Sequence, residues 1–224
     1  MRKNITQKGS KSADGRSYIE NDWFKNGIPE NVVLSEDVYI DTSYGFAAFH
    51  SSFPFAMTIG KGSGCYDRAS FVAGSKGRIE IGDYSILNGS LFICNENIKV
   101  GNHCMFAWGS VITDSWIKVE KLNVEQRRKI LQACALDHFR SLPFGETTSP
   151  VIIEDNVWVG FDAVIMPGVR LGKGCIVGSK SIVTEDVPAY TIVTGNPLKI
   201  IRQLQPDDTE EVKAAAMKEC LLRK

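Results

Sequence analysis

Large apolar residues recur every six positions through the C-terminal half of the chain, with polar residues and glycines between them. From Ile153 this series continues at Val159, Ile165, Leu171, Val177 and Val183. A second series of smaller side chains repeats at the same interval, at Val157, Ala163, Val169, Cys175 and Ser181. An α-helix requires spacings of three and four, and a two-sided strand requires alternation, so neither produces this period. The period predicts short parallel strands joined by sharp turns, three strands to a coil.

The same rhythm runs less regularly through an earlier block, residues 59–114. The inward positions expected there are Ile59, Cys65, Phe71, Ile81, Leu87, Ile93, Val100, Phe106 and Ile112. Steps longer than six residues, from 71 to 81 and from 93 to 100, predict small loops between coils. Glycine follows several of these positions, and its freedom of backbone conformation suits sharp turns. Both blocks therefore predict one mainly β solenoid of hexapeptide repeats.

The pattern stops between the two blocks, at residues 115–150. This segment contains LNVEQRRKILQACALDHF, in which Asn123 is a good helix cap and Gln126 stands at the capping-box position. We predict an excursion loop with a short helix. Long excursions from a compact repeat are commonly functional.

The repeat divides the chain into three parts. We expect an N-terminal extension and cap at 1–58, a β-helix domain at 59–205 that includes the excursion loop, and a C-terminal α-helix at 206–224. In the last segment acidic residues precede basic ones, which matches the helix dipole.

Charge and composition exclude several classes of function. Lys and Arg number 26, and so do Asp and Glu, so no overall field attracts a nucleic acid or an anionic membrane surface. No apolar stretch is long enough to span a membrane. The six cysteines show no zinc-ligand spacing and no disulfide framework, which predicts reduced thiols in a cytoplasmic protein.

The run from Pro150 to Arg202 resembles the C-terminal signature of the hexapeptide-repeat acetyltransferases. It reads PVIIEDNVWVGFDAVIMPGVRLGKGCIVGSKSIVTEDVPAYTIVTGNPLKIIR. The resemblance implies a left-handed parallel β-helix and a homotrimer with active sites at the subunit interfaces. It also implies an enzyme that moves an acetyl or short acyl group from acetyl-CoA to a hydroxyl or amine of a sugar or other small acceptor.

The resemblance also assigns residues to the CoA site. By position these are Trp158, Gly160, Ala163, Ser179, Lys199 and Arg202. Lys199 and Arg202 match basic residues that hold CoA phosphates, because such cations neutralise a phosphate locally. Each residue also has an ordinary structural interpretation: Trp158 as cover for a coil face, Gly160 as a turn residue, and the two cations as solvated surface charges.

The usual catalytic histidine of this family is missing from the matching segment, WGSVITDSWIKVE at 108–120. His138, in the excursion, is one candidate for the general base. Asp114 is the other, since a carboxylate can act as a base when desolvation raises its pKa. We interpret His50 and His103 as structural or surface residues.

Two other functions stay open. A solenoid without its base could serve as a scaffold or a CoA-binding subunit. A γ-type carbonic anhydrase would need three His ligands for zinc. The three histidines of this chain are widely separated, so we expect no metal.

Overall fold

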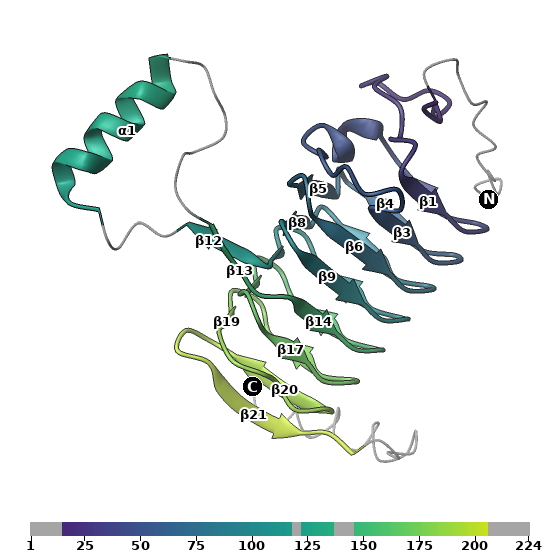
Figure 1. Ribbon diagram of the computed structural model, residues 1–224. Helices are drawn as coiled ribbons and strands as arrows, with labels where there is room; N and C mark the ends of the chain where they lie inside the picture. Colours follow the sequence, from purple (N-terminus) through teal and green to yellow (C-terminus); the bar gives the residue numbers. More distant parts are fainter. Residues whose placement is uncertain (1–14, 118–121, 137–145, 206–224) are drawn as a thin grey trace.

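The computed structural model describes residues 15–117, 122–136 and 146–205. In these parts the chain winds into a parallel β-helix, whose coils stack in order from the purple N-terminal end to the yellow C-terminal end (Figure 1). Three sheets form its walls, and most coils contribute one strand to each. Every pairing within these sheets is parallel except the last, between β20 and β21.

The sheets are named here in the order in which the chain enters them. The first sheet contains β1 (Val32–Leu34), β3 (Met57–Ile59), β6 (Arg78–Ile81), β9 (Asn97–Val100), β14 (Val151–Ile153) and β17 (Arg170–Leu171). The second contains β2 (Tyr39–Ile40), β4 (Gly64–Tyr66), β7 (Ile86–Asn88), β10 (Met105–Phe106), β15 (Trp158–Val159), β18 (Ile176–Val177), β20 (Thr191–Thr194) and β21 (Lys199–Gln203). The third contains β5 (Ser70–Ala73), β8 (Leu91–Cys94), β11 (Val111–Thr113), β16 (Val164–Ile165) and β19 (Ile182–Val183).

The core is the column of side chains enclosed by the three sheets. Both predicted six-residue series of the C-terminal block point into it, and each member is at most 2% exposed. Phenylalanines line part of this column: Phe46 contacts Phe71, Phe71 contacts Phe92 of the third sheet, and Phe92 contacts Phe106 of the second sheet. The apolar column therefore holds the coils together as the repeat predicts.

One inward position of the earlier block differs from the prediction. Phe92 is fully buried, whereas Ile93 lies on the outer face of the third sheet. The corner between β7 and β8 is one residue shorter than the period requires, and Gly89 turns it with a φ of +49°. Since a shift of one residue reverses every side chain of a strand, the strict six-residue count fails here.

The coil stack begins earlier than the repeat alone suggests. β1 pairs with β3 in parallel, so a first coil lies within residues 1–58, the segment expected to be an extension and cap. Before it, buried Asp22 accepts hydrogen bonds from Thr42 and Ser43 at the start of the 3-10 helix η1 (Ser43–Phe46). Irregular spacing hides this coil from a search for six-residue steps.

The excursion leaves the solenoid directly after Asp114, through an antiparallel ribbon of β12 (Ser115–Ile117) and β13 (Glu146–Thr148). It carries the predicted helix, α1 (Val124–Leu136), which Figure 1 shows to one side of the coils. The predicted capping box is confirmed, because Asn123 and Gln126 exchange side-chain to backbone hydrogen bonds of 2.9 Å.

The described chain ends in a hairpin that the repeat does not predict: β21 folds back along β20. The predicted C-terminal helix at 206–224 lies outside the described residues. No described helix is both long and apolar enough to cross a membrane.

Candidate functional site

A row of outward positions crosses the second sheet from β15 to β21. Trp158 pairs with Ile176, Ile176 with Ile192, and Ile192 with Arg202. Trp158 is 49% exposed, whereas the next residue, Val159, is fully buried, so the row faces away from the core. Because neighbouring strands lie about 4.8 Å apart, Trp158 and Arg202 are separated by about 14 Å along this face.

Lys199 joins the same face through the hairpin. Thr194 pairs with Lys199, and Thr194 and Ile192 are the two residues of β20 that are not buried in the core. Residues directly opposite each other in an antiparallel pair share a face, so Lys199 and Arg202 both lie on the outer side. Both are exposed, and neither forms an ion pair with a described residue. The structure thus brings the two predicted phosphate-binding cations onto the sheet that carries Trp158.

A hollow of about 460 Å³ opens beside Trp158 on this face. Its lining comes from the outer row, from the adjacent corner of the coils and from the end of the hairpin: His103, Met105, Asn156, Val157, Trp158, Gly174, Ile176, Tyr190, Leu204 and Gln205. Apolar and aromatic groups dominate this lining. This face can therefore bind an elongated ligand whose anionic groups lie near β21.

Gly160, Ala163 and Ser179 lie at the corner between the second and third sheets. A Cβ on Gly160 would stand 2.6 Å from the Ser179 nitrogen, so only glycine permits this close stacking. Ala163 is fully buried, and its carbonyl accepts a hydrogen bond from the Val111 amide at 2.8 Å. Ser179 is exposed, and its amide, carbonyl and hydroxyl form no hydrogen bond with a described residue. Ser179 is therefore the member of this group with polar atoms free for a ligand.

Two aromatic residues that the sequence reasoning did not select stand at the same corner. Trp108 and Phe161 stack with ring centroids 5.7 Å apart and planes at 10°, and they are 45% and 52% exposed. Each lies two residues after an inward residue of the second sheet, as Ser179 does, so aligning the repeats would have found them.

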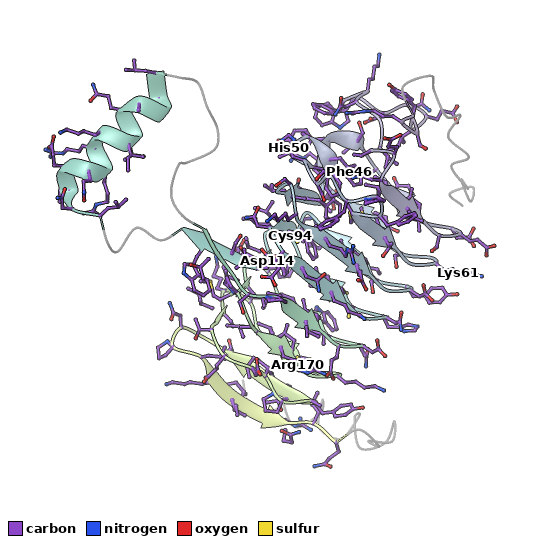
Figure 2. The ribbon with its side chains drawn as sticks, viewed as in Figure 1. Phe46, His50, Lys61, Cys94, Asp114 and Arg170 are labelled. Carbon is purple, nitrogen blue, oxygen red and sulfur yellow. The ribbon has the colours of Figure 1, made fainter. Side chains whose placement is uncertain are left out.

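Asp114 lies at a different corner, between the third and first sheets. It is fully buried, and its two carboxylate oxygens accept hydrogen bonds from the amides of Asn95 and Glu96, each at 2.8 Å. The Cys94 thiol also donates to it at 3.3 Å, and Figure 2 shows the two side chains together. Burial, and then the Asp114 carboxylate, raise the pKa of Cys94 far above its usual range. In the chain by itself Asp114 therefore holds the Asn95–Glu96 turn and has no exposed oxygen.

A polar hollow of about 660 Å³ adjoins this turn. It is lined by Phe53, Ser75, Lys76, Arg78, Glu80, Asn95, Glu96, Asn97 and Thr148. The buried Oδ1 of Asn97 has no hydrogen-bond partner among the described residues, and the Arg78 guanidinium lies 5.0 Å from the Phe53 ring centroid. Amide, carboxylate and cationic groups together suit a polar, hydroxylated ligand.

The histidines do not assemble in the described part of the chain. His138 lies outside the described residues. His103 is an exposed corner residue stacked on Tyr84, and exposed His50 follows the first coil (Figure 2). No group of three or more His, Cys, Asp or Glu side chains in the described ranges is arranged to hold a metal ion.

Within one chain the predicted residues form two separate groups. Trp158, Lys199 and Arg202 share the second sheet, with Ser179 at its edge, whereas Asp114 lies across the width of the third sheet from that edge. One copy of the chain therefore does not bring Asp114 to the predicted CoA face.

Comparison with known proteins agrees with the fold. Residues 150–185 match the family described as bacterial transferase hexapeptide (six repeats). A hexapeptide-repeat acetyltransferase of Vibrio cholerae O1, solved with acetyl-CoA, is 24% identical at a TM-score of 0.53, over 67% of this chain and 72% of that one. The N-acyltransferase AntD of Bacillus cereus, solved as a single-residue mutant with dTDP and CoA, is 18% identical at a TM-score of 0.55, over 87% and 89%. These matches confirm the predicted left-handed parallel β-helix.

Curated relatives match a shorter stretch. The 2,3,4,5-tetrahydropyridine-2,6-dicarboxylate N-acetyltransferase of Staphylococcus aureus strain bovine RF122 / ET3-1 is 52% identical over 73 residues, 32% of this chain. The enzyme of strain JH9 is 51% identical over the same length. The match spans about 30% of the length of these relatives. The resemblance to the hexapeptide-repeat acetyltransferases is confirmed.

Proposed function

We propose that this protein transfers an acetyl or other short acyl group from acyl-CoA to a hydroxyl or amine of a sugar or other small polar acceptor. The observation that carries the proposal is the outer row of the second sheet, which runs from Trp158 to the cations of β21, neither of which has an ion-pair partner among the described residues. The names of the curated relatives, and the CoA bound in the related structures, support the same chemistry.

The donor fits this face in an extended form. Lys199 and Arg202 would neutralise its phosphates. The Ser179 amide and carbonyl, which have no partner among the described residues, would bind the amides of its pantetheine arm. Trp158 and Ile176 would cover the apolar parts of the arm. Gly160 lets the next coil, which carries Ser179, stack closely on this corner.

The acceptor fits the polar hollow beside the Asn95–Glu96 turn. Asn97 offers a buried oxygen that lacks a partner among the described residues, and Glu80 and Glu96 can accept hydrogen bonds from hydroxyl or ammonium groups. The dTDP bound to AntD supports a sugar-nucleotide type of acceptor, and the S. aureus enzymes act on a dicarboxylate. Lys76 and Arg78 suit the anionic groups common to both.

In the reaction the acceptor oxygen or nitrogen attacks the thioester carbonyl carbon. A new C–O or C–N bond forms, the C–S bond breaks, and the acceptor proton ends on the CoA thiolate. His138 and Asp114 remain the proposed carriers of that proton. Asp114 can take this role only if the corner opens, because both of its oxygens hold backbone amides; otherwise it acts as a positioning residue for the turn.

We further propose a cytoplasmic homotrimer. The outer rows of the second and third sheets are largely apolar, whereas that of the first carries Glu80, Lys99 and Arg170. Contact between copies through the two apolar sheets would bring the CoA face of one chain to the Asp114 corner of another. The buried cysteines at 65, 94, 104 and 175 form no disulfide within the described part of the chain, which fits a reducing compartment.

Isothermal titration with CoA and acetyl-CoA tests the donor site. We expect micromolar binding that weakens at least about tenfold in the double variant Lys199→Ala, Arg202→Ala, since hydrogen bonds to charged groups contribute about 1.5–3 kcal/mol. The double variant Lys61→Ala, Lys99→Ala is the matched control, with Lys99 on the first sheet and Lys61 in the turn between β3 and β4. Release of free thiol in the presence of amino sugars and sugar nucleotides then tests transfer. No binding at millimolar ligand would reject the proposal and favour a scaffold.

A further inference from the structure

The corner between the second and third sheets carries one column of residues across three successive coils. The Asp162 amide donates to the Trp108 carbonyl at 3.1 Å, and the Lys180 amide donates to the Phe161 carbonyl at 2.7 Å. These bonds align Trp108, Phe161 and Ser179 one above the other. At about 4.8 Å per coil, the column is about 10 Å long.

Trp108 is held in a fixed orientation although it is 45% exposed. Its indole Nε1 donates to the Asp67 carboxylate at 2.8 Å, two coils away. The ring lies against Gly89 of the intervening coil, where an added Cβ would stand 3.0 Å from Trp108 Cδ1. Phe161 stacks on the ring from the next coil. The two rings therefore form a preformed apolar strip rather than a pair of mobile side chains.

The chemistry along the column changes in one direction. Beyond its Ser179 end lie the cations of β21, and Ser179 itself has an amide and a carbonyl with no partner among the described residues. The two coils that follow present the rings of Phe161 and Trp108, with the exposed Asp162–Lys180 ion pair beside them. The Trp108 coil is also the one that ends at Asp114. A ligand with phosphates, then amides, then an apolar end matches this order.

We propose that Trp108 and Phe161, fixed by Asp67, form the surface that receives the acyl chain of the donor and select acyl groups longer than acetyl. This inference rests on the proposed function, since it assumes that the donor is an acyl-CoA. An acetyl group is too short to cover two rings. Each added methylene that leaves water for this strip should tighten binding about two- to four-fold.

Titration of the whole protein with CoA, acetyl-CoA, butyryl-CoA and hexanoyl-CoA tests the inference. We expect affinity to rise with chain length in the natural protein. Trp108→Ala and Phe161→Ala should remove most of this rise and leave the affinity for free CoA unchanged. Trp108→Phe, which keeps a ring but loses the bond to Asp67, should remove part of it. Trp23→Ala, at an exposed Trp elsewhere, is the matched control, and circular dichroism verifies folding of each variant.

Several outcomes would overturn the inference. If the natural protein binds all four ligands with equal affinity, the proposed CoA site stands, and only the proposed acyl-binding role of Trp108 and Phe161 is rejected. Equal weakening of CoA and all thioesters in Trp108→Ala would assign the rings to the CoA body instead. A smaller assembly on sedimentation of Trp108→Ala, with chain-length preference unchanged, would assign them to contact between copies. Failure of every CoA compound to bind would reject the proposed function as well.

Discussion

The thiol of Cys94 donates a hydrogen bond to the carboxylate of Asp114 across 3.3 Å, inside the corner from which the excursion departs. The same carboxylate accepts the amides of Asn95 and Glu96. Three donors on two buried oxygens make Asp114 the anchor of the turn that borders the polar hollow. The stability of the corner and the shape of the hollow therefore depend on this one side chain.

Asp114→Asn should lower the free energy of unfolding by about 2–3 kcal/mol, because the asparagine NH₂ would replace an acceptor and leave a buried donor without a partner. Urea denaturation measures the change. Glu36→Gln, in the exposed pair with Lys61, is the control and should leave the stability nearly unchanged. Unchanged stability of Asp114→Asn together with complete loss of transfer would instead identify Asp114 as the base.

The inward positions of the solenoid could be read from the sequence because each strand is short and every coil repeats one geometry. Ile153 and Val159 are typical: their six-residue spacing alone fixes which side faces the core. Ile93 was assigned wrongly because the preceding corner loses one residue, and a period cannot show a local deletion. The hairpin of β20 and β21 escaped prediction because the repeat ends before β21 begins.

The candidate site was predicted less completely than the fold. Trp158, Lys199 and Arg202 were selected from the resemblance and share one sheet, whereas the link between Trp108 and Asp67 joins residues 41 positions apart. Only the register of intervening coils brings them together. The polar hollow likewise combines residues of β6 and β9 with Thr148, on the returning strand of the excursion, and no single segment signals it.

Gly160→Ala should destabilise the corner by about 1–3 kcal/mol, since the new methyl group would stand 2.6 Å from the Ser179 nitrogen and force the backbone apart. Thermal unfolding measures the loss. The Gly160→Ala substitution should also weaken CoA binding, because Ser179 would move. Lys180→Ala, beside Ser179 but exposed, is the control and should leave both quantities nearly unchanged. A Gly160→Ala protein as stable as the natural one would contradict the close stacking.

Burial raises the pKa of the Cys104 thiol to about 11. The unfolded chain loses this proton near about pH 8.5, whereas the folded chain keeps it, so the thiol stabilises the fold fully below that pH and progressively less above it. Between about pH 9 and about pH 11 its contribution should decline by about 1.4 kcal/mol per pH unit. Urea denaturation at several pH values should show a shallower decline for Cys104→Ala. Identical slopes would mean that the thiol ionises as readily in the fold as outside it.

The outer faces of the sheets predict how copies of the chain meet. Val164 lies between Val111 and Ile182 on the outer row of the third sheet, and Ile152 lies between Lys99 and Arg170 on the first. If the third sheet is covered in a trimer, Val164→Glu would bury a charge without a partner and should dissociate the assembly. Ile152→Glu makes the same change on a charged wall and should leave it intact. Sedimentation velocity distinguishes one chain of 24.7 kDa from three. Dissociation by Ile152→Glu rather than Val164→Glu would assign the contact to the first sheet.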